Sequence, residues 1–136
     1  MQNYWGFVMS NSLRNPGFLQ NFKILKSGSY PMFNFGVREA WGVNLVEVEF
    51  ERLQALIPEL QALMNPEPEW FAHFFRDYEL VVVYRQRTYT MSVARKETWV
   101  EALEYGHQLG IPALELDFVP NTTETARKWF RRMRVG

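Results

Sequence analysis

The sequence contains no cysteine in its 136 residues, which excludes disulfide bonds, thiol catalysis and zinc sites built on cysteine. It also has no long hydrophobic run. The longest apolar stretches, at 4–9 and 80–84, are far shorter than the ~20 residues of a membrane-spanning helix. The first residues have neither the basic stretch nor the long apolar stretch of a secretion signal. These absences predict a cytoplasmic protein that has no membrane partner.

Motifs for nucleotide and acyl-transfer chemistry are missing as well. The sequence has neither of the two common glycine-rich phosphate loops. Ser10 and Ser92, the serines considered as nucleophiles, do not lie in a Gly-x-Ser-x-Gly elbow. We therefore predict no catalytic serine and expect no cofactor.

Histidine is scarce, with two residues in the whole chain. If 70–76 is a helix, His73 shares a face with Glu69 and Asp77, and these three side chains could ligate a divalent metal. Packing of His73 among phenylalanines, or pairing with a neighbouring acid, is the commoner pattern, so no metal site is predicted. His107 could act as a general base near neutral pH. Because no partner is marked in the sequence, we interpret it as a histidine at the edge of the core.

Two pairs of carboxylates recur at a spacing of two residues, Glu47 with Glu49 and Glu115 with Asp117. Paired carboxylates carry out acid–base chemistry in glycoside hydrolysis. Alternating acids on a strand are more often its solvated face, and we prefer that interpretation for both pairs.

Hydrophobic periodicity predicts the order of the elements. Period-two alternation indicates strands at 41–50, 88–93 and 112–120, and helical spacing indicates helices at 51–64 and 96–110. The continuous apolar run 80–84 is typical of a central strand that is covered on both faces. The segment 70–75 fits either type. We predict a single α+β domain over 1–136. Its core, 44–119, would be a ferredoxin-like βαββαβ sandwich with an antiparallel sheet and both helices on one face. Residues 1–43 would supply loop-rich strands (4–10 and 18–25) that extend the sheet or cover its edge.

The C-terminal segment 121–134 is predicted to be a basic amphipathic helix, capped by Asn121 with Glu124 at its third position. The formal net charge of +0 argues against a protein built mainly to hold phosphate backbones. However, six glutamates and one arginine lie between 47 and 69, whereas five bases and one glutamate lie in 124–136. The candidate residues for binding an acidic partner are Arg127, Lys128, Arg131, Arg132, Arg134 and Trp129.

Two uses of this helix remain open. In the preferred one, Phe130 and Met133, which share the apolar side of the helix with Ala126, dock it on the core, while its basic face meets the acids of 47–69 within the monomer or across a homodimer. In the other, the arginines contact phosphates and Trp129 stacks on a base.

The sequence thus predicts a non-catalytic binding or interaction module that self-associates, most simply as a homodimer. The alternatives are a protein that binds nucleic acid or an acidic protein through the basic helix, and a small enzyme whose pocket the sequence does not reveal.

Overall fold

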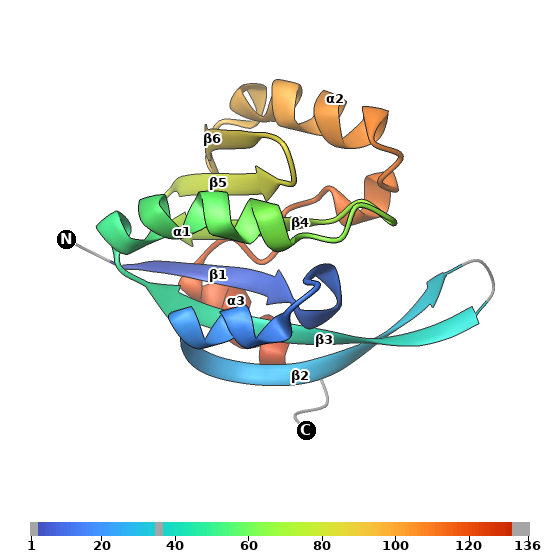
Figure 1. Cartoon of the computed structure of the whole chain (residues 1–136). Coiled ribbons are helices and arrows are strands. Elements are labelled where there is room, and N and C mark those ends of the chain that lie inside the picture. The colour runs from blue at the N-terminus through green and yellow to red at the C-terminus, as the bar shows by residue number, and fades with distance from the viewer. Residues whose placement is uncertain (1–2, 35–36, 132–136) are drawn as a thin grey trace.

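The computed structural model describes residues 3–34 and 37–131 and contains a six-stranded sheet in the order β2-β3-β1-β4-β5-β6 (Figure 1). Every pairing in it is antiparallel, which confirms the predicted α+β class and the antiparallel sheet. The strands are β1 (Tyr4–Met9), β2 (Lys23–Asn34), β3 (Val37–Val48), β4 (Phe71–Arg76), β5 (Glu79–Tyr84) and β6 (Thr88–Ser92). The helices are α1 (Phe50–Leu63), α2 (Val100–Gln108) and α3 (Thr123–Arg131).

The N-terminal strand β1 lies inside the sheet, between β3 and β4. The prediction that the N-terminal strands extend the sheet or cover its edge is therefore wrong for β1. Its sequence explains the position, because Tyr4 and Val8 are buried on one face and Phe7 on the other. A strand that is apolar on both faces needs cover on both sides.

The strand expected over 18–25 begins later and extends further. Residues Pro16–Asn21 form a 3₁₀ helix, at whose start the Asn15 side chain accepts a hydrogen bond from the Gly17 N–H (3.1 Å). β2 then runs from Lys23 to Asn34 in register with β3. The stretch 26–34, which lies outside the two strands expected in 1–43, is therefore strand.

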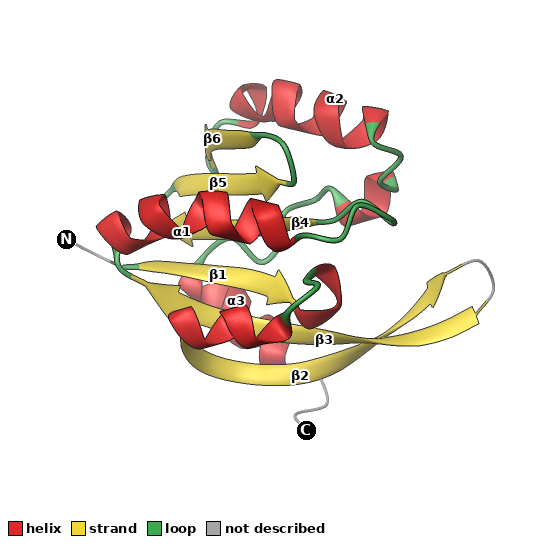
Figure 2. Cartoon of the chain, viewed as in Figure 1, coloured by secondary structure: helices red, strands yellow, loops and turns green. Residues whose placement is uncertain are grey.

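The helices cover both faces of the sheet (Figure 2), so the prediction of two helices on one face is wrong. β5 shows the division, because Val81 and Val83 pack in the core under α1, whereas Leu80 and Val82 pack in the core that includes residues of α2 and α3. The expectation that 80–84 is a central strand, covered on both faces, is confirmed.

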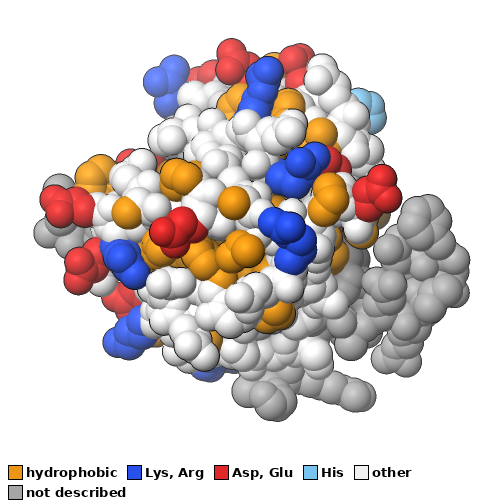
Figure 3. Space-filling model, viewed as in Figure 1, with side chains coloured by type: hydrophobic (Ala, Val, Ile, Leu, Met, Phe, Trp, Pro, Cys, Tyr) orange, Lys and Arg blue, Asp and Glu red, His pale blue; other side chains and the backbone are white. Residues whose placement is uncertain are grey.

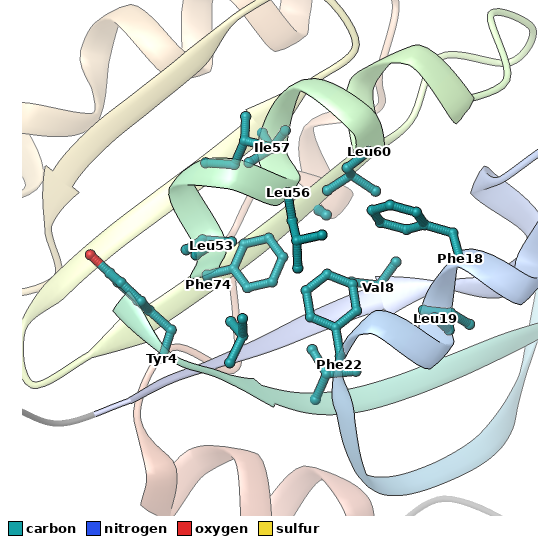
Figure 4. Close-up of a cluster of buried hydrophobic side chains, with 14 of the residues drawn as sticks. Tyr4, Val8, Phe18, Leu19, Phe22, Leu53, Leu56, Ile57, Leu60 and Phe74 are labelled. Carbon is teal, nitrogen blue, oxygen red and sulfur yellow. The ribbon is translucent and has the colours of Figure 1, made fainter. Parts of the chain in front are cut away.

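The core under α1 contains the helical stripe predicted from the sequence. Leu53, Leu56, Ile57 and Leu60 are all buried in the cluster that also contains Phe74 (Figure 4). Pro58 lies inside the helix on its exposed side. There the missing backbone N–H leaves a carbonyl accessible to water.

The segment 112–120, predicted to be a strand, contains only the 3₁₀ turn Ala113–Glu115 and joins no sheet. No neighbouring strand pairs with it, and its side chains Leu116 and Phe118 are buried in the core instead. The segment 71–76, for which helix and strand were both open, is β4. Without the last strand, and with β1 between β3 and β4, the ferredoxin-like arrangement is not confirmed.

The C-terminal helix α3 packs on the core, as the preferred interpretation of the sequence predicted. The contact is made by Ala126 and Phe130, which are both buried. Its cap is one residue later than predicted. The Thr125 N–H donates to the Thr122 hydroxyl (3.1 Å) and the Thr122 N–H donates to the Thr125 hydroxyl (3.0 Å). This is a reciprocal capping box built on Thr122 and Thr125.

Charged side chains of both signs are scattered over the face that carries α1 (Figure 3). Within the described residues, no helix has the length and apolar character needed to cross a membrane. The cytoplasmic location stays a prediction.

Candidate functional site

A cavity of about 300 Å³ lies between the sheet, the segment 111–119 and α3. It is on the side of the sheet opposite α1, and its lining is mostly aromatic and aliphatic. Its volume is at the lower end of the range typical of small-molecule sites. The lining residues are Phe7, Met9, Glu69, Trp70, Phe71, His73, Ile111, Leu114, Glu115, Asp117, Phe118, Val119 and Trp129.

Neighbouring strands β1 and β4 form the floor of the cavity, where Phe7 and His73 face each other in the antiparallel register. Their rings are stacked, with centroids 5.6 Å apart and planes 8° apart. The buried His73 donates from Nε2 to the Pro120 carbonyl oxygen (2.7 Å). Burial lowers the pKa of His73 to about 4, so the ring is neutral near pH 7 and fixes the segment that ends at Pro120.

The segment 111–119 forms one wall and is held by buried side chains rather than by strand pairing. Ile111, Leu116 and Phe118 belong to the core on this side of the sheet. The Phe118 ring packs edge-on against Phe71 of β4, with centroids 5.5 Å apart. These anchors set the position of the wall relative to the floor.

A close contact between α2 and the sheet supports this wall from behind. The Tyr84 hydroxyl donates to the Ala102 carbonyl oxygen of α2 (2.7 Å). A Cβ atom on Gly106 would lie 2.7 Å from both the Tyr84 hydroxyl and a Leu116 methyl group. Glycine at this position therefore lets α2, β5 and the cavity wall meet.

α3 closes another side of the cavity through Trp129. The Trp129 ring packs edge-on against Phe7 (centroids 5.2 Å apart) and contacts Phe130 of the same helix (5.8 Å). Trp129, predicted to be a residue for stacking on a base, is thus part of the cavity wall and packs on the sheet.

Three carboxylates of the described residues line the cavity, and no lysine or arginine of residues 3–34 and 37–131 does so. Burial raises the pKa of Glu115 above its ordinary value. Asp117 is exposed, and its Oδ1 accepts a hydrogen bond from the Val119 N–H (3.2 Å). Glu69 Oε1 pairs with Arg85 (3.0 Å), whereas its buried Oε2 accepts no hydrogen bond within the described residues.

An apolar side chain stands exposed at the opening of the cavity. Leu114, in the turn Ala113–Glu115, is 92% exposed and also lines the cavity. A leucine that is exposed next to an aromatic cavity offers an apolar surface to a bound molecule.

Of the four residues of the predicted basic site that the structure describes, Trp129 alone lines the cavity. Arg127, Lys128 and Arg131 are exposed. Arg127 lies over the Trp5 ring (5.5 Å to its centroid), and Lys128 pairs with Glu124 of the same helix (3.3 Å). Arg132 and Arg134 lie outside the described residues, as does Met133. Whether the helix binds an acidic partner or pairs with the acids of 47–69 is untested, and both stay predictions.

The metal site that was considered around His73 needed a helix over 70–76, and that segment is strand β4 instead. In a strand, a spacing of four residues separates side chains by about 13 Å, too far for shared metal ligands. Among residues 3–34 and 37–131, no cluster of three metal-ligating side chains is found. His107 is exposed near the end of α2 and does not line the cavity.

Sequence reasoning noticed Glu115 and Asp117 as a pair but interpreted them as the solvated face of a strand. The structure places them on an irregular segment, with both residues lining the cavity. No sequence signal brings Phe7, Glu69 and Trp129 to the same place, because they come from three distant parts of the chain.

Comparisons with protein-family models, curated proteins and solved structures find no match to this chain.

Proposed function

We propose that the protein is a non-catalytic binding module that holds a small molecule in the cavity between the sheet, the segment 111–119 and α3. The observation that supports this proposal is the cavity itself, a formed space of about 300 Å³ with a mostly apolar lining and a few polar groups. That combination is typical of small-molecule sites.

The state of His73 argues for binding rather than catalysis. A general base works best when its pKa lies near the working pH. Burial lowers the pKa of His73 to about 4, and its Nε2 is committed to the Pro120 carbonyl oxygen. This histidine therefore holds the cavity together and is a weak base.

The packing of Trp129 also bears on the nucleic-acid alternative. Its ring contacts Phe7 and Phe130, so base stacking would require this aromatic cluster to open. Binding of nucleic acid or of an acidic protein through the arginines of α3, and self-association as a homodimer, stay predictions.

Nuclear magnetic resonance titration with three phenols of similar size tests the proposal. The probes carry a cationic, a neutral or an anionic para substituent: para-trimethylammonium phenol, para-tert-butylphenol and para-hydroxybenzoate. We expect at least one probe to shift the backbone amide signals of 69–73 and 111–119. The proposal fails if none of the three shifts these signals at millimolar concentration.

Leu114→Ala checks that the shifts report binding in the cavity. Because the leucine is 92% exposed, its truncation should change the free energy of unfolding by less than ~0.5 kcal/mol. Loss of apolar contact should weaken the affinity for the bound probe about fivefold.

Val100→Ala is the matched control for Leu114→Ala, since Val100 is also apolar and exposed (49%) but does not line the cavity. It should leave the affinity unchanged. Equal affinity in the wild type and Leu114→Ala would place the binding site elsewhere.

A further inference from the structure

We propose that the ligand of this cavity is an organic cation, such as a quaternary ammonium or another alkylated amine. The inference rests on the proposed binding function and adds the chemical class of the ligand. Two independent features of the lining carry it: the sign of its charges and the number of its aromatic rings.

The charges of the lining have one sign. Among the described residues, Glu69, Glu115 and Asp117 are its three carboxylates, and no lysine or arginine lines it. His73 lies in the floor as a neutral ring and adds no positive charge near pH 7. A cleft lined by one sign of charge with apolar walls concentrates the opposite ion.

The carboxylates differ in how far the protein already neutralises them. Arg85 pairs with Glu69 through Oε1, which leaves the buried Oε2 without a hydrogen-bond donor in the described part of the chain. Asp117 accepts one backbone hydrogen bond. Neither Glu115 nor Asp117 has an ion pair with a described residue. A cation in the cavity would supply the countercharge for these two groups.

The aromatic rings suit the same ligand. Five of the lining residues are phenylalanine or tryptophan, and a cation within ~6 Å of such a ring is attracted to its face. Sites for quaternary ammonium groups combine these two elements, because the rings replace the water around the alkyl groups while the carboxylates balance the charge. The aromatic residues are Phe7, Trp70, Phe71, Phe118 and Trp129.

A neutral apolar ligand would use the rings without the carboxylates, and an anion would be repelled by them. The informative comparison is therefore between the affinities of a cation and of an uncharged molecule of the same shape. Para-trimethylammonium phenol and para-tert-butylphenol form such a pair, because a quaternary nitrogen in one replaces a quaternary carbon in the other.

The deciding experiment measures the affinities of this pair for the wild-type protein and for Glu115→Gln with Asp117→Asn. We expect the wild type to bind the cation at least fivefold more tightly than the neutral probe. The double variant should lose about tenfold in affinity for the cation and less than twofold for para-tert-butylphenol. Both replacements keep the side-chain shape, and asparagine retains the oxygen that accepts from the Val119 N–H.

The variant Glu101→Gln with Glu104→Gln is the control, because it changes the net charge equally at exposed positions of α2 that do not line the cavity. It should keep the preference for the cation. If the neutral probe binds the wild type as tightly as the cation, or if the control loses the preference equally, the cation proposal fails while the binding function stands. Absence of binding by all three phenols would overturn both.

Discussion

At the scale of single residues, His73 is the buried ionisable group that connects the sheet to the cavity wall. It is 6% exposed, stacks on Phe7 and donates to the Pro120 carbonyl oxygen. Burial opposes its charged form and lowers its pKa from 6.5 to about 4, although the nearby Asp117 acts in the opposite direction. Folding therefore favours the neutral ring.

This pKa shift predicts a loss of stability in acid. The unfolded chain binds a proton at His73 near pH 6.5, whereas the folded chain does so only near pH 4. The stabilisation is complete above pH 6.5 and is lost as the pH falls from 6.5 to about 4, by about 3 kcal/mol in total. The measurement is the free energy of unfolding in urea at several pH values across this window.

His73→Gln should flatten that part of the pH profile, because glutamine can donate to the Pro120 carbonyl oxygen but does not titrate. His107→Gln is the control, since His107 is exposed, and it should follow the wild-type profile. A His73→Gln profile as steep as that of the wild type would assign the acid sensitivity to other groups.

At the scale of elements, the fit of α2 against β5 depends on Gly106. In the interior of a helix, alanine is normally more favourable than glycine by ~1 kcal/mol. Here we expect Gly106→Ala to destabilise the protein by about 1–3 kcal/mol. The reason is that the new Cβ would lie 2.7 Å from the Tyr84 hydroxyl and from a Leu116 methyl group.

Urea unfolding measures the effect of Gly106→Ala, with Glu104→Ala at an exposed position of the same helix as the control. The control should change the free energy of unfolding by no more than ~0.5 kcal/mol. A more stable Gly106→Ala variant would show that helix propensity outweighs the contact.

The elements that the sequence predicted are those whose apolar spacing is local and complete. Leu53, Leu56 and Leu60 marked α1, and the apolar run 80–84 marked β5. Gly110, the last residue of the predicted helix 96–110, follows α2 with a φ of +84° and an N–H that donates to the His107 carbonyl oxygen (3.0 Å). In these cases the residues of the element itself are enough to predict its type and position.

Where the prediction was wrong, residues far apart in the chain decide the structure. The alternation of Leu114, Leu116 and Phe118 resembles a strand, but no neighbouring strand pairs with it. Its apolar residues divide instead between the core (Leu116, Phe118) and the opening of the cavity (Leu114). Similarly, the prediction placed β1 at the sheet edge, and this was wrong. Its pairing with β3 and β4 depends on residues more than thirty positions away, which a local pattern does not contain. The cavity was not foreseen for the same reason.

At the scale of the whole molecule, one sheet separates two hydrophobic cores. Leu56 of α1 belongs to one and Phe130 of α3 to the other. Because the side chains do not share a cluster, we expect Leu56→Val and Phe130→Leu to destabilise the protein additively, within ~0.5 kcal/mol. Urea unfolding of both single variants and of the double variant gives the coupling energy.

Phe7→Leu with Phe130→Leu is the comparison pair, because these two rings are in contact, with centroids 5.3 Å apart. This pair should show a coupling energy above ~0.5 kcal/mol. Strong coupling between Leu56 and Phe130 would mean that the sheet transmits strain from one core to the other.

The irregular segment 111–119 can tolerate substitutions at the positions that are not buried. Its buried anchors are Ile111, Leu116 and Phe118. The segment also contains four positions that are not buried and that line the cavity, Leu114, Glu115, Asp117 and Val119. No sheet hydrogen bond depends on these four positions. Substitutions there can therefore accumulate with little cost to folding, so that descendants of this chain could differ in the shape and charge of the cavity while the same architecture persists.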